Sequence, residues 1–557
     1  MEVVNKIDYR NAILKNKSLE LQFDQIELDD KEIIDEDTHD YSQDYLTFEV
    51  LEDGAFSFTE NIKYSYNNSE WIQLNAGTNT CNINKGDVIR IKNDDAEYIS
   101  CSITKSLKFL AYGSFDKSRI KCAHFFEDSK IVNAKNIILG RKLNYNSMFS
   151  GCTSLVNAPE LPATALYKSC YYMMFYGCTS LVNAPELPAT KLSNNCYSGM
   201  FYGCTSLVNA PKLPATKLSE SCYSSMFSGC TSLVNAPKLP ATTLSNSCYS
   251  SMFSHCTSLV NASELPATTL SAHCYNSMFS GCTSLVNTPE LPATTLSNSC
   301  YNGMFYGCTS LVNTPELSAT TLSSYCYNDM FYGCASLVNA PELPATILSN
   351  SCYSYMFYGC TSLVNAPELP ATTLSESCYS SMFNRCTSLV NAPELPATTL
   401  SNSCYSYMFY GCNSLANAPE LPATTLSESC YSYMFYGCAS LFNAPKLPAT
   451  ILSESCYSYM FYGCASLVNA PELPATTLSD WCYNGMFYGC VNLNYIKAMF
   501  ITTQCNCTDG WVGGVAPCGT FVKLAGIQFE EDIIPKSWTV QEIDPDTGEI
   551  VNKYINE

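Results

Sequence analysis

A 26-residue period constrains the fold of this chain more than any other feature. Cysteines recur at positions 152, 178, 204 and onward to 490, and a second series runs from 170 to 482 at the same spacing. One unit reads MFYGCTSLVNAPELPATTLSNSCYSY, and thirteen full copies extend from Met148 to Gly485, followed by a degenerate fourteenth. A unit of this size cannot bury its own apolar face, so neighbouring units must stack. The period therefore predicts a solenoid.

The two halves of each unit follow different patterns. In residues 349–360, Cys352, Met356 and Cys360 are four residues apart with Phe357 beside them, an apolar stripe that predicts a short helix. The other half contains two prolines, which lack backbone donors, so we expect a strand of about three residues followed by an extended arm. The expected fold class is an α/β solenoid of 26-residue units, each a short helix plus a short strand or extended arm.

The pattern M-F-x-G-C-x-S-L-x-x-A-P-x-L-P recurs through the array. It resembles the BspA-type leucine-rich repeats of bacterial surface proteins, and the resemblance covers about 60% of the chain. The period is longer than the roughly 23 residues usual in that family, because each unit carries a longer Pro-Ala-Thr-Thr-Leu-Ser arm. The resemblance implies a leucine-rich-repeat-like array in a surface or adhesion protein.

The segments outside the array differ from it in composition. Residues 29–44 alone contain eight carboxylates, which predicts a solvated acidic segment. Alternating apolar residues begin at Tyr45 and predict a small β-sandwich, and the C-terminal tail predicts a β-rich cap that ends in a hairpin. The predicted domains are an acidic segment 1–44, a β-sandwich 45–113, an N-terminal cap 114–147, the solenoid 148–498 and the C-terminal cap 499–557.

The flanking segments carry a second resemblance. Residues 511–523 and 534–540 are similar to the closing segment of many gut Bacteroidales and phage surface proteins. The segment near Tyr45 is similar to segments of the same group, which includes presumed phage tail proteins. These resemblances imply a virion component, with the N-terminal region as a contact to other virion proteins.

The composition excludes several classes of protein. The chain has 29 basic and 50 acidic residues, so its net charge is −21, which argues against nucleic acid because phosphate contacts need clustered Lys and Arg. No apolar run approaches the roughly 18 residues of a membrane span, so no membrane insertion is expected. The first residues are too polar for a signal peptide. A Sec-exported protein would therefore have lost its signal, or the chain leaves the cell another way.

The 27 repeat cysteines have three interpretations. We favour buried free thiols, which pack as small hydrophobic groups. Disulfides are an alternative, but residues eight apart on a helix are about 12 Å apart and cannot be bridged. Metal ligation is the third, and His255 and His273 near Cys256 and Cys274 would be the candidates, although drift at exposed repeat positions explains both histidines better. In the tail, a local bridge among Cys505, Cys507 and Cys518 stays open.

Catalytic motifs are missing from the sequence. It contains no Gly-x-Ser-x-Gly elbow and no Walker loop. Composition alone does not exclude a carboxylate pair for glycoside cleavage, but the repeat glutamates are identical copies, whereas a catalytic pair is unique. We therefore expect no enzyme, no catalytic residue, no bound metal and no cofactor.

Two columns of repeat positions are candidates for binding. Tyrosine pairs three residues apart lie on the free face of the predicted helices and resemble the composition of binding paratopes, with inter-helix packing after duplication as the alternative. The second column holds seven exposed glutamates in successive units, which either bind cations or splay apart in solvent. The predicted ligand-binding residues are Tyr355, Tyr358, Tyr407, Tyr410, Tyr433, Tyr436, Tyr459 and Tyr462. The glutamates are Glu264, Glu290, Glu316, Glu342, Glu368, Glu394 and Glu420.

Three functions follow from these features. The first is a phage tail or fibre component on the virion surface that binds a bacterial surface polysaccharide, with tyrosine rings stacked on sugar faces. The second is a BspA-like adhesin on the bacterial cell surface, with a protein or matrix partner. The third is a polymer-degrading tailspike. The missing leader favours the first over the second, and the missing acid pair disfavours the third.

Overall fold

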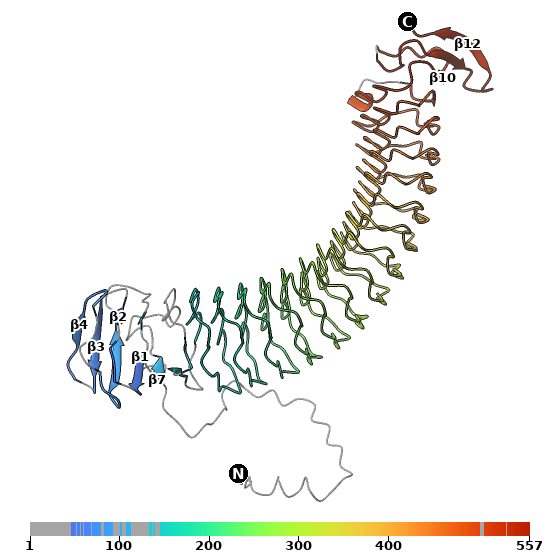
Figure 1. Ribbon diagram of the computed structural model, residues 1–557. Coiled ribbons are helices and arrows are strands. Elements are labelled where there is room, and N and C mark those ends of the chain that lie inside the picture. Colours follow the sequence, from blue (N-terminus) through green and yellow to red (C-terminus); the bar gives the residue numbers. More distant parts are fainter. Residues whose placement is uncertain are drawn as a thin grey trace, which may run out of the picture. The chain divides into compact units, whose positions relative to one another are not determined.

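The computed structural model describes residues 46–51, 53–55, 57–58, 61–67, 69–78, 83–92, 101–102, 107–112, 133–135, 137–139, 145–501, 506–530 and 532–557. The predicted acidic segment 1–44 lies outside these residues, and so does most of the predicted cap 114–147. The described residues contain a β-sheet region, a long stack of coils and a C-terminal sheet (Figure 1). Nowhere in these described ranges does a helix have the length and apolarity needed to cross a membrane.

Two sheets form before the array. The larger has the order β4-β3-β5-β1-β7-β8, with every pair antiparallel except the last, and β2 pairs with β6 separately. In β5, Ile89 and Ile91 are fully buried, whereas Val88, Arg90 and Lys92 are not, as the period-two pattern predicts. The assembly of 45–113 into a sandwich stays a prediction. The strands are β1 Leu46–Val50, β2 Ser57–Phe58, β3 Ile62–Tyr66, β4 Ile72–Leu74, β5 Val88–Lys92, β6 Cys101–Ser102, β7 Leu107–Tyr112 and β8 Ile137–Ile138.

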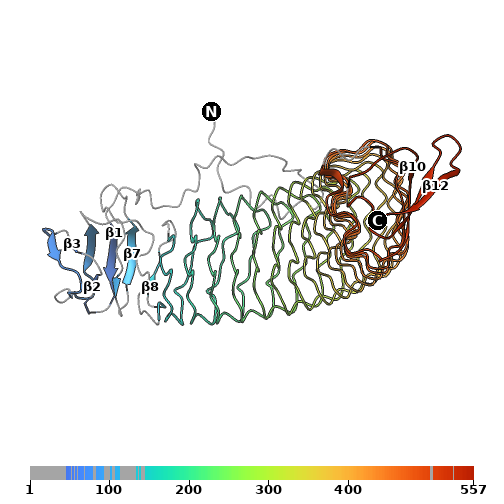
Figure 2. The same cartoon turned by 90° about the horizontal axis from the view of Figure 1, so that it is seen from above.

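The array is a stack of coils, one per 26-residue unit, as the period predicts. Figures 1 and 2 show the coils lying side by side in register, and the stack bends along its length. Each coil has a turn run, residues 349–360 and their equivalents, and an arm, residues 363–374 and their equivalents. The arms form single parallel bridges at two repeat positions, at the asparagines, as from Asn365 to Asn391, and near the end of the arm, as from Thr373 to Thr399.

The turn run is not a helix, so the predicted helix is wrong. Alternate amides donate to the next coil, as from Tyr353 N to Cys378 O at 3.0 Å and from Phe357 N to Met382 O at 2.9 Å. The amides between them close tight turns, as from Met356 N to Tyr353 O at 3.2 Å. Among the described residues the single helical element is the short 3-10 helix η2, Asn506–Thr508.

A four-residue repeat of backbone angles explains the error. Ser351, Tyr355 and Gly359 have φ values of 54°, 57° and 70°, so a left-handed residue recurs every four positions. That spacing brings Cys352, Met356 and Cys360 to the same side, which is the pattern that a helix would also produce. Isolated helices of this length are marginal, whereas each turn run gains a row of hydrogen bonds from its neighbours.

Columns of identical side chains fill the interior of the stack. The residues predicted as core, Met356, Phe357, Leu363 and Leu369, are at most 3% exposed, so that prediction is confirmed. Rings of consecutive coils stack, with 5.6 Å between the centroids of Phe331 and Phe357. The tyrosine after each second-series cysteine forms another buried column. Nine described members of this column have buried hydroxyls without a hydrogen-bond partner: Tyr171, Tyr197, Tyr223, Tyr249, Tyr275, Tyr353, Tyr379, Tyr405 and Tyr483.

The repeat cysteines are buried free thiols, as the favoured interpretation predicts. From Cys178 onward, each thiol of the first series donates to the carbonyl of the phenylalanine 29 residues earlier, as from Cys386 Sγ to Phe357 O at 3.0 Å. Burial raises the pKa of the Cys352 thiol to about 12, although nearby backbone hydrogen bonds lower it. Thiolates are therefore scarce at neutral pH, and reaction with external reagents is suppressed.

A four-stranded sheet follows the array, with the order β12-β11-β10-β9. Strands β11 and β12, the last two in the chain, pair antiparallel, which confirms the predicted terminal hairpin. Lys523 donates to Glu542 at 2.6 Å inside this region, while Cys507 is disulfide-bonded and Cys518 is free and exposed. The strands are β9 Tyr495–Lys497, β10 Thr520–Leu524, β11 Thr539–Ile543 and β12 Ile550–Ile555.

Deleting one whole unit should be tolerated, because each coil contacts only its neighbours. We expect a chain without residues 282–307 to keep its circular dichroism and cooperative unfolding. A chain without residues 282–304 should lose both, because the shift of three residues turns core side chains outward. Equal behaviour of the two deletions would contradict the 26-residue register.

Thiol titration tests the cysteine columns. Because the repeat thiols are buried, we expect few to react in the native protein and 27 more to react after denaturation without reductant. An unchanged count on denaturation would mean that the repeat cysteines are bridged.

Removing an unpaired core hydroxyl should stabilise the array. Tyr275→Phe deletes a buried hydroxyl that has no partner, so the free energy of unfolding in urea should rise by about 1 kcal/mol. Tyr301→Phe is the matched control, since the Tyr301 hydroxyl is not among the buried unpaired groups. A loss of stability in Tyr275→Phe would show that this hydroxyl is hydrogen-bonded.

Candidate functional site

The eight predicted tyrosines lie on the outer surface of the turn runs. Between Ser403 and Cys412, Met408 and Phe409 are buried, whereas Tyr407 and Tyr410 are partly exposed. Tyr407 occupies one of the recurring left-handed positions, with a φ of 59°. The same backbone repeat that buries the core side chains therefore presents these two tyrosines outward, although no helix is present.

The outer tyrosines form two parallel columns. The Tyr407 column contains Tyr407, Tyr433 and Tyr459, with centroids 4.5 Å and 4.7 Å apart in consecutive coils. The Tyr410 column begins at Tyr410 and continues to Tyr436 at 4.6 Å, then through residues 462 and 488. Within a coil the two rings are tilted, with 6.0 Å between the centroids of Tyr407 and Tyr410. Six predicted residues are thus brought together as one patch.

The ring faces inside these columns are not available to a ligand. A ring inside a column is covered on both sides by its neighbours, with planes only 6° apart for Tyr410 and Tyr436, whereas the first rings, Tyr407 and Tyr410, have a stacked ring on one side. At the C-terminal end, the ring of Tyr459 lies so close over Gly485 that a Cβ there would collide, and Tyr488 does the same over Gly513. The expected stacking of sugars on these rings is therefore wrong inside the columns, where ring edges and hydroxyls remain for contact.

Partial burial and neighbouring hydroxyls raise the pKa of tyrosines in the middle of the patch. Desolvation, with added contributions from Tyr407 and Tyr459, raises the pKa of Tyr433 to about 12. The pKa of Tyr436 is raised as well, first by desolvation and then by the neighbouring Tyr462 and Tyr410. The hydroxyls of Tyr433 and Tyr436 therefore stay neutral at physiological pH, and a neutral tyrosine hydroxyl both donates and accepts hydrogen bonds.

The other two predicted residues belong to a separate group. Tyr358 stacks on Tyr332 at 4.4 Å, and Tyr332 stacks on Tyr306 at 4.5 Å. Tyr355 lies beside Tyr358 at 6.1 Å. The sequence interpretation missed Tyr306, Tyr332 and Tyr488 because it searched for pairs within a unit, whereas following each repeat position along the chain would have found them.

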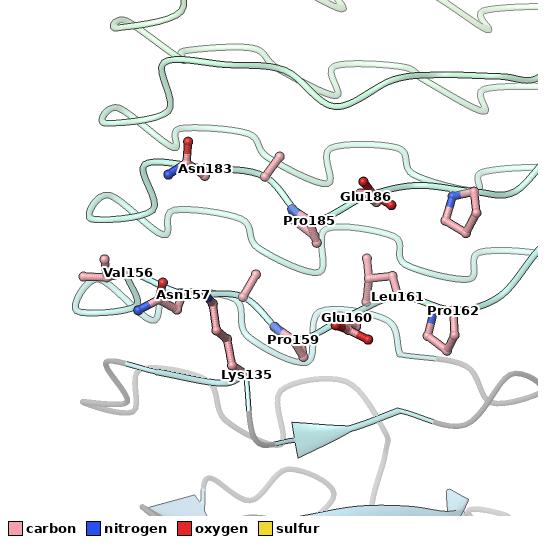
Figure 3. A pocket seen from close by; sticks show the side chains of 13 residues that line it. Lys135, Val156, Asn157, Pro159, Glu160, Leu161, Pro162, Asn183, Pro185 and Glu186 are labelled. Atoms are coloured by element: carbon pink, nitrogen blue, oxygen red, sulfur yellow. The ribbon is translucent and has the colours of Figure 1, made fainter.

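The arms present a second surface, lined by proline and glutamate. All seven predicted glutamates are exposed, which fits separated, solvated side chains. A surface pocket of about 550 Å³ lies on the first two arms, where Glu160 and Glu186 lie on consecutive coils and Lys135 comes from the segment before the array (Figure 3). A smaller pocket of about 310 Å³ recurs at Glu394 and Glu420. These hollows are open and lined by short arms, so they offer little enclosure to a ligand.

The histidines are not assembled into a metal site. His255 replaces a glycine at a φ of 59°, its Nδ1 lies 2.8 Å from Ser254 Oγ, and its ring covers Gly281. Within the described part of the chain, no group of three or more His, Cys, Asp or Glu side chains is placed to hold a metal ion. The histidines thus remain surface variants of the repeat.

Comparison with known proteins concerns the array. The family described as BspA type Leucine rich repeat region matches residues 129–259, 198–338, 298–440 and 402–506. Repeats of this type are typical of surface and adhesion proteins and are generally non-catalytic. No curated protein and no solved structure matches the chain significantly. Because the matches span residues 129–506, well over half of the chain, the protein belongs to the BspA-type leucine-rich repeat family.

Proposed function

We propose that the protein is a non-catalytic recognition protein that binds a bacterial surface polysaccharide through its outer tyrosine columns. The observation that carries this proposal is the pair of stacked columns, in which neutral hydroxyls repeat at ring spacings of 4.4–4.7 Å. Glycans are recognised largely by hydrogen bonds to hydroxyls, and a neutral tyrosine hydroxyl supplies both a donor and an acceptor.

Periodicity favours a polymer over a compact partner. Identical subsites on successive coils can bind successive units of one chain, so weak contacts add through multivalency. The rings are held by their neighbours and by the backbone hydrogen bonds beneath them, so little side-chain entropy is lost on binding. A protein partner would more often use a varied, asymmetric surface.

The proposed setting is the surface of a phage virion, as part of a tail or fibre. The flanking segments resemble those of phage and gut Bacteroidales surface proteins, and the N-terminal region would then attach to other virion proteins. The alternative setting is a bacterial cell surface, with a protein or matrix ligand. Immunogold labelling of virions and of whole cells distinguishes the two.

The tailspike alternative is the weakest of the three. Asp329 is a partly buried carboxyl in the outer position of its coil, and burial raises its pKa to about 6, a value suited to an acid catalyst. Burial is the cause of that rise, with no contribution from a second carboxylate. A glycosidase needs a pair of carboxyl groups about 5–9 Å apart, so Asp329 alone does not support hydrolysis.

A set of tyrosine variants tests the proposal. The probe is a printed array of purified bacterial capsular and O-antigen polysaccharides, followed by affinity measurements on any polysaccharide that binds. Changing Tyr407, Tyr410, Tyr433, Tyr436, Tyr459 and Tyr462 to Phe keeps the stacks and removes only hydroxyls. We expect affinity to fall by about ten-fold or more, because several weak hydrogen bonds are lost together.

Tyr176→Phe with Tyr202→Phe is the matched control, because these stacked rings lie elsewhere on the same face and in isolation from the patch. Its affinity should equal that of the wild type, and circular dichroism should show all variants folded. Unchanged binding by the six-fold variant would remove the columns from the mechanism. Release of short oligosaccharides by the wild type would move the protein to the enzyme class.

A further inference from the structure

One coil interrupts both outer tyrosine columns. In the unit that contains residues 377–402, Ser381 stands at the position of Tyr407 and Asn384 at the position of Tyr410. Tyr355 and Tyr358 lie one coil before this unit, and the main patch begins one coil after it. The same unit has Arg385 where most coils have glycine, with a φ of 60°.

At the interrupted coil, the neighbouring tyrosine rings have a face on which no other tyrosine stacks. Inside the columns the faces are covered by neighbouring rings, and at the C-terminal end they are covered by Gly485 and Gly513. The faces of Tyr407 and Tyr410 that point toward the interrupted coil have only Ser381 and Asn384 beside them in their columns. Stacking of a flat-faced ligand ring on this patch is therefore confined to one coil.

Tyr355 differs from the rings of the patch because no ring stacks on it. Its column has Asp329 before it and Ser381 after it, so no ring stacks on either face, and its side chain is 39% exposed. Ser381 is only 2% exposed, although Ser225, Ser251 and Ser277 at the same repeat position are partly exposed. The flanking side chains thus cover Ser381. Tyr407 is held by its stack on the next coil, so Tyr355 is the ring that can swing away.

At this coil one buried polar group lacks a hydrogen-bond partner, and one cation has an aromatic ring but no carboxylate beside it. Asn384 is 7% exposed, and its Oδ1 is buried without a hydrogen-bond donor, an arrangement that costs free energy unless a ligand supplies one. The Arg385 side chain is exposed, with its guanidinium carbon 5.8 Å from the centre of the Tyr358 ring. In the described structure it has no carboxylate within ion-pair distance. An acceptor and a cation therefore accompany the free ring faces.

We propose that the interrupted coil is a subsite for a hexuronate residue of the polysaccharide, an inference that rests on the proposed function. The sugar ring takes the place of the missing tyrosine ring between Tyr355 and Tyr407, where one ring fits because stacked rings are spaced about one coil apart. A sugar hydroxyl donates to Asn384 Oδ1. The carboxylate accepts hydrogen bonds from the Arg385 guanidinium, whose planar fork matches it.

Charge selects the uronate over a neutral sugar or an aromatic side chain. Arg385 is a cation on a chain of net charge −21, and the residues beside it in the two columns, Ser381 and Asn384, carry no charge. A neutral ring would fill the same space but would leave the guanidinium unpaired. The carboxylate is therefore the group that distinguishes the proposed ligand.

The test uses the full chain with trigalacturonate and its fully methyl-esterified form as probes. The two trisaccharides have the same rings and hydroxyls, and they differ at the carboxyl groups, which are anionic in the acid and neutral methyl esters in the other probe. We expect wild type to bind the acid about ten-fold more tightly than the ester, as for one charge-assisted hydrogen-bonded pair. Added salt should weaken the binding of the acid and leave that of the ester unchanged.

Three variants locate the subsite. Arg385→Gly introduces the residue that most other coils carry and should reduce the affinity for the acid to that for the ester. Ser381→Tyr completes the Tyr407 column and should abolish binding of both probes at this coil. His255→Gly is the matched control, because it relieves the same left-handed position in a distant coil and should change nothing. Circular dichroism and urea unfolding verify that each variant folds.

The outcomes separate this inference from the proposed function. Equal binding of acid and ester by wild type, or undiminished binding by Ser381→Tyr, overturns the subsite. If wild type binds neither trisaccharide but binds polysaccharides on the array through the six tyrosines, the subsite is wrong and the proposed function stands. If the trisaccharides bind as expected while the six-fold Phe variant keeps full affinity for polysaccharide, the subsite stands and the hydroxyl columns fail.

Discussion

The backbone hydrogen bond from one coil to the next is the interaction on which the rest of the structure depends. In the turn run every second amide makes this bond. From Ser351 to Gly359, the N–O distances to the next coil are 2.8–3.0 Å. These bonds fix the register, so a side chain at any repeat position lies directly beside its counterpart 26 residues away. The columns of rings, thiols and asparagines are therefore a consequence of the register, because any residue that recurs at one repeat position forms a column.

The register gives tyrosine two different roles. In the core column, Tyr353 and Tyr379 stack 5.7 Å apart with buried, unpaired hydroxyls, so their contribution is packing and each hydroxyl is a cost. In the outer columns the rings are only partly buried and their hydroxyls are within reach of solvent. One residue type thus serves as structure on one side of the backbone and as a candidate binding surface on the other.

The sequence determines the repeat, its length and its core, since these depend on the period alone. It did not determine the backbone of the turn run, because Cys352, Met356 and Cys360 occur at a spacing of four in a helix and in the observed turns alike. Of the residues at the left-handed positions, only glycine commonly adopts a positive φ. Serine and tyrosine seldom do, so their presence there gave no sign of the left-handed backbone.

The tyrosine patch was predictable as a set of residues but not as a geometry. The pairs of Tyr407 and Tyr410 and their repeats are visible in the sequence. The sequence does not show that the ring faces are covered, because this depends on the spacing between rings of neighbouring coils. The importance of Asn384 and Arg385 likewise depends on which rings remain uncovered beside them.

The direction of the hydrogen bonds between coils has a consequence for assembly. In an ordinary β-sheet each edge alternates donors and acceptors, so two copies of one edge can pair and aggregate. In the turn runs the amides that cross between coils donate to the C-terminal neighbour, apart from Tyr197 N, which donates to Cys170 O, and the carbonyls that receive them point back. Two like edges would therefore oppose donor to donor or acceptor to acceptor. The arms do not share this polarity, since Val390 N and Thr398 N donate to the preceding coil. The backbone therefore disfavours edge-to-edge self-association along the turn runs alone.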